Sequence, residues 1–122
     1  MTTTTQPKPN YERGEIILEL FQHSDLRTAK TRPALIVQAD DLQTGLPQVI
    51  VAMVTSRSFR ANHPSRVLIR LSTPEGQRSG LLTDSVVMTD NLATIAEVAI
   101  DRVIGTLPMK DVDKALRHAL GL

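Results

Sequence analysis

Short apolar runs separated by turn-forming residues occupy most of the chain. Runs of strand length occur at residues 14–21, 34–38, 48–55, 66–71, 85–89 and 94–98, with a weaker one at 102–107. In the run at 66–71, apolar and charged residues alternate, which is typical of a strand with one face in solvent. Glycine, proline and asparagine stand between the runs, for example at residues 44–47 and 74–76. The pattern predicts about five to seven short antiparallel strands.

Only the C-terminal end of the chain has a helical pattern. Apolar residues recur there at helical spacing, as Met109, Val112, Leu116, Ala119 and Leu120. Pro108 suits the first turn of this helix, and Gly121 suits its end. We therefore expect a mainly β fold with a C-terminal helix, built as a small, strongly bent antiparallel sheet or barrel.

Size and composition indicate a single domain. The chain has 122 residues, of which 41% are hydrophobic and only 2% aromatic. Residues 1–10 combine low hydrophobicity with two prolines, so we expect a disordered N-terminal tail followed by one domain over residues 11–122. No apolar run approaches the length of a membrane span, and the first residues lack the apolar core of a signal peptide. We expect a soluble, cytoplasmic protein that does not contact a membrane.

Cysteine and histidine usage narrows the chemistry. The chain has no cysteine, which excludes disulfides, thiolate zinc sites and cysteine nucleophiles. His23, His63 and His118 lie far apart in the sequence and form no metal-ligand pattern. We therefore expect neither a metal nor a cofactor.

The charge distribution is more informative than the net charge of +1. Residues 42–74 contain no acid, and residues 26–39 contain none either. The cations of these two segments are Arg57, Arg60, Arg66 and Arg70 in the first, and Arg27, Lys30 and Arg32 in the second. A surface of this kind attracts a polyanion, although a scattered set of solvated arginines is the plainer interpretation.

Two polar segments adjoin buried runs. In the first, Lys30 and Arg32 precede Pro33, which disfavours helix at Arg32, so we expect these cations to end a loop where a strand begins. In the second, Thr55 and Ser56 end the apolar run at 49–54 and are followed by an arginine. Two such strand ends can bring guanidinium and hydroxyl groups together, a combination suited to phosphate.

The order of these segments resembles the MazF/PemK family of messenger-RNA endonuclease toxins. The resemblance is carried by residues 13–16, 30–37, 55–56, 80–87, 92–95 and the terminal helix, and it extends over about residues 11–122. It implies an SH3-like barrel with a CcdB-like (MazF/PemK) fold, a homodimer and a cognate antitoxin protein of a type II toxin-antitoxin system. It also implies metal-independent, sequence-selective cleavage of single-stranded messenger RNA in which Arg32 is the catalytic arginine and Thr55 the catalytic threonine. The loop before the arginine departs from the family, because Arg27 stands where an acid is common.

The expected chemistry needs few protein groups. RNA carries its own nucleophile, the 2′-hydroxyl, so an enzyme must align it, stabilise phosphoryl charge and move protons. Arg32 can donate two parallel hydrogen bonds to phosphoryl oxygens, and Thr55 can add a hydroxyl donor. The resemblance further implies that Arg32 takes part in acid/base catalysis. Structural alternatives stay open at this point: Arg32 capping a loop carbonyl or pairing with Asp84, and Thr55 only ending a strand.

The remaining candidate residues are contacts to RNA. We expect the RNA backbone to be followed by Lys30, Ser56, Arg57, Arg60, Arg66 and Arg27. Because aromatic residues are few, we expect base recognition to depend mainly on hydrogen bonds from loops. Two rival functions fit the same fold: a non-catalytic CcdB-like toxin that binds a protein target such as DNA gyrase, and a degenerate binding module.

Overall fold

The computed structural model describes residues 11–22 and 29–122 of the chain, so the predicted tail at 1–10 lies outside the described residues. One antiparallel sheet contains six strands in the order β4-β5-β3-β2-β1-β6. The strands are β1 (Glu15–Gln22), β2 (Ala29–Ile36), β3 (Gln48–Thr55), β4 (Arg66–Ile69), β5 (Ser85–Ala96) and β6 (Ile100–Thr106). The helical elements are η1 (Ser58–Ala61), α1 (Pro74–Arg78), η2 (Glu97–Ala99) and α2 (Lys110–Leu120). The predicted mainly β fold with a C-terminal helix is confirmed.

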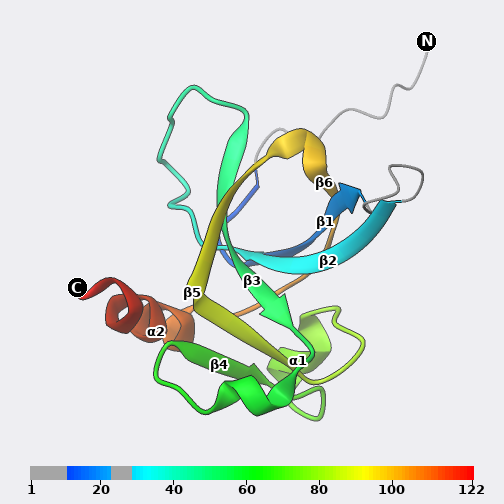
Figure 1. The fold of residues 1–122 in the computed structure, drawn as a ribbon, viewed down its shortest axis with the longest axis vertical. Coiled ribbons are helices and arrows are strands. Elements are labelled where there is room, and N and C mark those ends of the chain that lie inside the picture. The colour runs from blue at the N-terminus through cyan, green and yellow to red at the C-terminus, as the bar shows by residue number, and fades with distance from the viewer. Residues whose placement is uncertain (1–10, 23–28) are drawn as a thin grey trace.

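Strand β5 connects the two ends of the molecule (Figure 1). The sequence pattern predicted two strands here, at 85–89 and 94–98, and this prediction is wrong. Ala52 of β3 pairs with Leu92, whereas the next residue, Met53, pairs with Met88, so residues 89–91 form a bulge in one continuous strand. The expected turn residues Asp90 and Asn91 therefore bend β5 instead of ending it.

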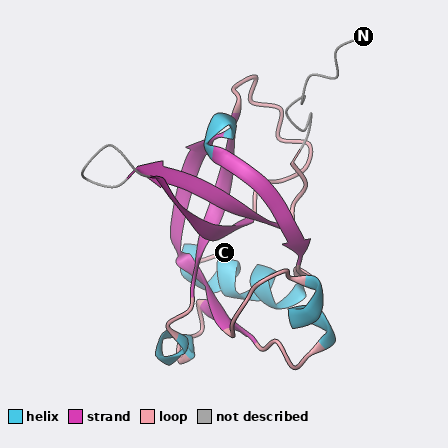
Figure 2. Cartoon of the chain, turned by 90° about the vertical axis from the view of Figure 1, so that its right-hand side faces the viewer, coloured by secondary structure: helices cyan, strands magenta, loops and turns pink. Residues whose placement is uncertain are grey.

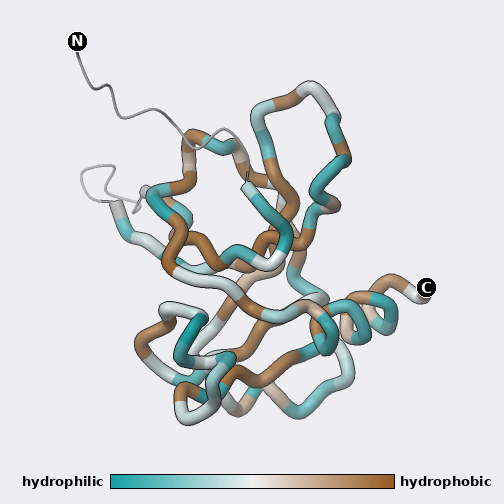
Figure 3. Tube along the Cα trace, turned by 180° about the vertical axis from the view of Figure 1, so that it is seen from behind, coloured by the Kyte–Doolittle hydropathy of each residue, from teal (hydrophilic) through white to brown (hydrophobic). Residues whose placement is uncertain are grey.

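The sheet has a hydrophobic core on each face. On one face, Ile17, Ala34 and Val51 belong to a buried cluster, and on the other, Ile16, Leu35 and Ala52 belong to a second cluster. Neighbouring residues of a strand point to opposite faces, so burial on both faces explains why Ile16 and Ile17 are adjacent in β1 and why β3 is almost continuously apolar. The apolar segments gather along the inner strands in Figure 3.

Helix α2 packs against the second cluster, where Val112 is fully buried. This confirms most of the predicted apolar stripe, although Leu120 at the end of the stripe is 55% exposed. Gly121 ends the helix in the left-handed conformation, at φ 72°. Among the residues that the structure describes, no helix is long and apolar enough to cross a membrane.

Helix α1 was not predicted, because its five residues contain a proline and a glycine and resemble a turn. Thr73 starts this helix, because its Oγ1 accepts a hydrogen bond from Gly76 N at 3.1 Å. Glycine is needed twice nearby: a Cβ on Gly76 would collide with the backbone of Arg70, and one on Gly105 would collide with the backbone of Ser79. These close approaches fix α1 and the loop after it against β6, and Figure 2 shows both α-helices at the same end of the molecule.

Candidate active site

The two predicted cations of the first polar segment lie inside a strand rather than in a loop. Strand β2 begins at Ala29, because it pairs with β1 from Ala29 to Leu35. The register places Arg32 directly opposite Glu19 and Lys30 directly opposite Phe21. Arg32 therefore belongs to the sheet, and its position is set by the β1–β2 ladder.

Pro33 separates β2 from β3 and so opens the site. The Val37 N–H donates to Ile50 O of β3 at 3.1 Å, so by alternation the backbone of Pro33 also faces β3. Pro33 has no N–H to donate, and the β2–β3 ladder contains only Ala34–Ile36 on the β2 side. Strand β3 continues to Thr55 without β2 and stays paired with β5. If the register ran on past Pro33, Thr55 would lie opposite Arg32.

A groove of about 680 Å³ lies at these parted strand ends, and we call it the strand-end groove. Its walls come from β1, β2, β3, β6, the loop after α1 and the start of β5. It is lined by Leu18, Lys30, Thr31, Arg32, Pro33, Val54, Thr55, Ser56, Gly80, Leu81, Leu82, Thr83, Ser85, Arg102 and Ile104. Both predicted catalytic residues and two predicted RNA contacts, Lys30 and Ser56, therefore border one groove.

The guanidinium of Arg32 is held on one edge and one face. Its Nε donates to Glu19 Oε1 at 2.8 Å, and its Cζ lies 4.5 Å from the centroid of the Phe21 ring. Arg32 therefore pairs with Glu19 and not with Asp84, whose Oδ1 accepts from Leu71 N at 2.8 Å. Among the described residues, neither Nη nitrogen of Arg32 has a hydrogen-bond partner, and 49% of the side chain is exposed. The charge is fixed in place while its forked end stays available.

The hydroxyl of Thr55 is oriented by the chain that follows it. Arg57 N donates to Thr55 Oγ1 at 3.2 Å, which uses an acceptor position of the hydroxyl. Within the described residues no acceptor takes the hydroxyl proton, so it can be donated to another group. This is the geometry that a donor to a phosphoryl oxygen requires.

Two other predicted RNA contacts lie at the corner between η1, β4 and the β5 bulge. Arg66 donates from Nε and Nη2 to the two carboxylate oxygens of Asp90, at 2.9 and 2.7 Å, and from Nη1 to Arg60 O at 2.9 Å. The Arg66 hydrogen bond lowers the pKa of Asp90 from 3.8 to about 2. The Arg60 guanidinium lies near Met88 Sδ and Phe59. The structure therefore does not bring Arg60 and Arg66 into the strand-end groove.

Arg57 and Arg27 are the two remaining predicted RNA contacts. Arg57 is exposed directly after Ser56, whereas Arg27 lies outside the described residues. Sequence reasoning missed Arg102, which lines the groove from β6 opposite Leu18. Its run at 102–107 had a weak strand pattern, and only the sheet order shows that β6 lies beside β1. Within residues 11–22 and 29–122, no group of three or more histidine, aspartate or glutamate side chains is arranged to hold a metal ion.

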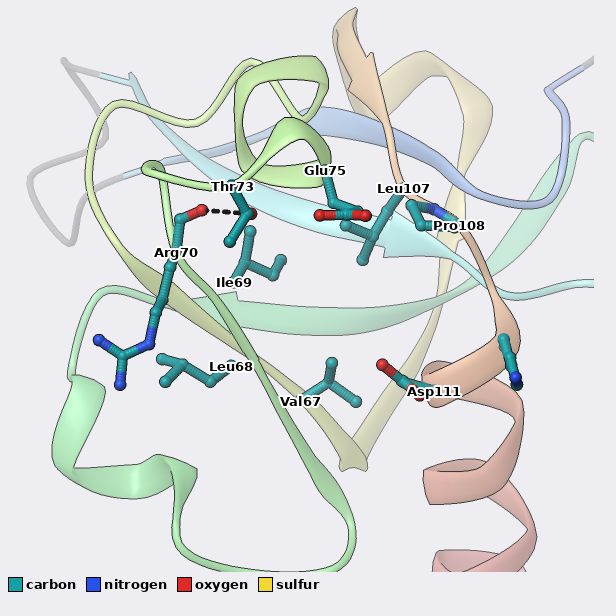
Figure 4. A pocket seen from close by; sticks show the side chains of 10 residues that line it. Val67, Leu68, Ile69, Arg70, Thr73, Glu75, Leu107, Pro108 and Asp111 are labelled. Carbon is teal, nitrogen blue, oxygen red and sulfur yellow. Dashed lines mark hydrogen bonds between the residues drawn. The ribbon is translucent and has the colours of Figure 1, made fainter.

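A second pocket lies between β4, α1 and the start of α2 (Figure 4). It has a volume of about 380 Å³ and a largely apolar floor that includes Val67, Ile69 and Leu107. Its rim carries both signs of charge, with Arg70 and Lys110 against Glu75 and Asp111. None of the predicted catalytic or RNA-contacting residues lines this pocket.

Comparisons with known proteins agree with this fold. Residues 12–120 match the family model described as PemK-like, MazF-like toxin of type II toxin-antitoxin system. The chain therefore belongs to the MazF/PemK toxin family. It is 32% identical over 115 residues to endoribonuclease MazF6 of Mycobacterium tuberculosis strain H37Rv, covering 90% of this chain and 96% of the relative.

Solved structures give the same result for the fold. A mycobacterial endoribonuclease in complex with its cognate antitoxin superimposes with a TM-score of 0.70 and 23% identity, over 92% of this chain and 96% of that chain. The M. tuberculosis toxin MazF-mt6 superimposes with a TM-score of 0.63 and 26% identity, over 87% of this chain and 97% of that chain. The predicted family and its fold are confirmed.

Proposed function

We propose that this chain is a toxin that cleaves single-stranded messenger RNA internally, without a metal ion, and that acts in the cytoplasm. The observation that carries the proposal is the strand-end groove. There Arg32 presents two Nη nitrogens that have no partner within the described residues, and Thr55 presents a hydroxyl group. Family membership supports the same reaction, since a relative with 32% identity is named an endoribonuclease.

In the proposed reaction, the RNA 2′-oxygen attacks the adjacent phosphorus and the bond to the 5′-oxygen of the next nucleotide breaks. The products are a 2′,3′-cyclic phosphate and a 5′-hydroxyl. Arg32 stabilises the charge on the phosphoryl oxygens with two parallel hydrogen bonds, and Thr55 adds a third donor. We also assign Arg32 a part in the proton transfers, on the strength of the family resemblance.

The neighbouring cations bind the RNA backbone in this proposal. Lys30 and Arg102 line the groove on either side of β1, and Arg57 follows Ser56 at its exit. The other proposed contacts to the RNA are Arg27, Arg60 and Arg66. Arg66 can reach a phosphate only by giving up hydrogen bonds that it already makes to Asp90 and Arg60.

We further propose a homodimer that is inhibited by a cognate antitoxin. Two copies related by a twofold axis would repeat the groove and offer an extended RNA path. A structural neighbour was solved in complex with its cognate antitoxin, which supports an inhibitor protein here. Sedimentation at micromolar concentration tests the dimer. A strictly monomeric protein that cleaves RNA at full rate would rule out dimerisation as a requirement.

One experiment tests the reaction. The purified chain is incubated with a long single-stranded RNA, with and without EDTA, and both ends of each fragment are mapped. We expect discrete fragments that form equally well in EDTA and carry a 2′,3′-cyclic phosphate and a 5′-hydroxyl. No cleavage by a folded protein would favour the rival functions, a toxin that binds a protein target or a degenerate binding module.

A further inference from the structure

We propose that Glu19 is a positioning residue that holds the catalytic arginine by Nε alone, so that both Nη nitrogens of Arg32 stay available for the scissile phosphate. This inference rests on the proposed RNA cleavage. It adds a residue that does not contact the reacting phosphate but acts through Arg32.

The burial of Glu19 is the first observation. Among the described residues, Glu19 is the only charged residue that is buried, with 7% of its surface exposed. It lies in the apolar strand β1, and the sheet alternation puts its side chain on the same face as Ile17 and Phe21. A buried carboxylate is costly unless it is paired and hydrogen-bonded. A glutamate at this strand position is therefore explained by its partner and not by the core.

The geometry of the pair is the second observation. Arginine has five N–H donors, and in the described part of the chain Glu19 Oε1 accepts from Nε of Arg32 alone, at 2.8 Å. The carboxylate therefore does not take the two-point geometry that a guanidinium usually offers to a carboxylate. The donors left over are the four on Nη1 and Nη2, which can make two parallel bonds to a phosphate.

Phe21 adds a second constraint from the same strand. It lies two residues after Glu19, so the two side chains share one face of β1. Its ring centroid is 4.5 Å from Cζ of Arg32, which is within the range of a cation–π contact. One in-plane hydrogen bond and one aromatic contact therefore restrict the long arginine side chain before RNA binds. Donors that are oriented in advance do not have to reorganise during the reaction.

Replacement of Glu19 by two residues of similar size separates this role from a structural one. Glu19→Gln keeps an oxygen that can accept from Nε of Arg32. Glu19→Leu removes the acceptor but places an apolar side chain at a buried apolar position. The Arg32 charge that loses its partner is half-exposed and can be solvated, so it does not become an unpaired buried charge. Asp113→Ala is the matched control, because Asp113 also pairs with an arginine, Arg13, but does not line the strand-end groove.

Single-turnover cleavage at saturating RNA is the main measurement, with binding of an uncleavable RNA measured separately. We expect Glu19→Leu to lower the cleavage rate constant about 10- to 100-fold, the size of effect caused by misplacing a catalytic group, with RNA affinity within about threefold of wild type. The cleavage rate constant of Glu19→Gln should stay within about fivefold of wild type, and that of Asp113→Ala should equal wild type. The NMR signal of the Arg32 Nε–H group should move in Glu19→Leu and change little in Glu19→Gln.

The outcomes separate this inference from the proposed function. If wild type cleaves RNA, Arg32→Ala does not, and folded Glu19→Leu cleaves at the wild-type rate, the positioning role is wrong and the proposed function stands. A Glu19→Leu loss that appears only in RNA affinity, or an equal loss in Glu19→Gln, also overturns the role. If wild type cleaves no RNA, the proposed function fails first, and the inference fails with it.

Discussion

Arg32 and Arg66 lie in two regions that share one sheet and differ in what the sheet leaves available. In the strand-end groove, Arg32 uses only Nε for a contact to protein, and its Nη nitrogens have no partner among the described residues. At the corner of β4 and the β5 bulge, Arg66 uses Nε, Nη1 and Nη2 for contacts to Asp90 and Arg60. The comparison shows that two arginines from basic segments of the sequence can differ in how many of their donors the fold leaves available to a ligand.

The hydroxyl groups of the two regions differ in the same way. Thr55 Oγ1 accepts from Arg57 N and keeps its proton, whereas Thr89 Oγ1 donates its proton to Ser65 O at 2.6 Å. Thr89 is fully buried, and Thr55 is at the edge of the groove. One region therefore has donors available for a phosphate, and the other has used its donors to stabilise a bent strand.

The largest difference between the regions should appear in alanine substitutions of the two arginines. We expect Arg32→Ala to reduce RNA cleavage by about 100-fold or more, because it removes oriented donors to the transition state. Arg66→Ala should change cleavage less than about tenfold and should lower the urea midpoint of unfolding, because it removes the partner of Asp90. Single-turnover cleavage and urea denaturation check both variants. A cleavage loss in folded Arg66→Ala as large as that in Arg32→Ala would break the comparison.

Substitutions of the two threonines sharpen the comparison. We expect Thr55→Ala to reduce cleavage about 100-fold and Thr55→Ser to stay within about tenfold of wild type, because serine keeps the hydroxyl donor. Thr89→Val should leave cleavage nearly unchanged and reduce stability, since it removes a buried hydrogen bond. Circular dichroism verifies the folds. Wild-type cleavage by folded Thr55→Ala would show that the hydroxyl has no catalytic part.

A smaller effect is expected for the charges that follow Thr55. The double variant Arg57→Glu, Arg60→Glu should weaken binding of an uncleavable single-stranded RNA about tenfold. Binding should also become less dependent on salt, by about 0.7 in the logarithmic slope for each phosphate that the variant no longer neutralises. Lys114→Glu, Arg117→Glu on α2 is the matched charge control, since neither residue lines the groove. Equally weakened binding in the two double variants would indicate general attraction by net charge and no local RNA path.

Most of the strands could be predicted from the sequence because apolar runs and turn residues report local preferences. The strand at 48–55 was predicted with its observed bounds, and the terminal helix was predicted in place. The β5 bulge could not be predicted, because Asp90 and Asn91 have the composition of a turn and only the pairing with β3 shows that the strand continues. Helix α1 was missed because its five residues include a proline and a glycine and so resemble a turn, and the pattern does not show that Gly76 packs closely on the backbone of Arg70.

The part of the candidate site that could be predicted consists of polar residues at the ends of apolar runs. Arg32 and Thr55 were identified from polar residues beside buried runs and from the family resemblance. Glu19 was not identified, because a single acid in an apolar run has no local signature, and its role depends on the β1–β2 register. Arg66 shows the opposite case. Its acid-free segment predicted a contact to RNA, but its guanidinium donates to the carboxylate of Asp90, which lies 24 residues later in the β5 bulge.

The smallest predicted effect is a pH dependence of stability at the Arg66 corner. The Arg66 hydrogen bond lowers the pKa of Asp90 from 3.8 to about 2 in the folded protein. The unfolded chain therefore binds this proton more tightly than the folded protein does. The pair stabilises the fold fully above about pH 4, and this contribution is lost as the pH falls toward 2. Because the side chain of Asp90 is 38% exposed, solvent and salt screen the pair and the contribution is modest.

Asp90→Asn isolates this contribution from the acid sensitivity of the rest of the chain. The free energy of unfolding of wild type should exceed that of Asp90→Asn slightly at pH 6, and the two should converge between pH 4 and pH 2, because only wild type loses the ion pair in that range. Urea denaturation at half-unit steps of pH measures both curves, and added salt should narrow the gap at pH 6. The RNA cleavage rate of Asp90→Asn at pH 7 should stay close to that of wild type. The Asp90 carboxylate accepts hydrogen bonds from Arg66, which does not line the strand-end groove. Parallel stability curves with no convergence at low pH would show that Asp90 does not stabilise the fold through its charge.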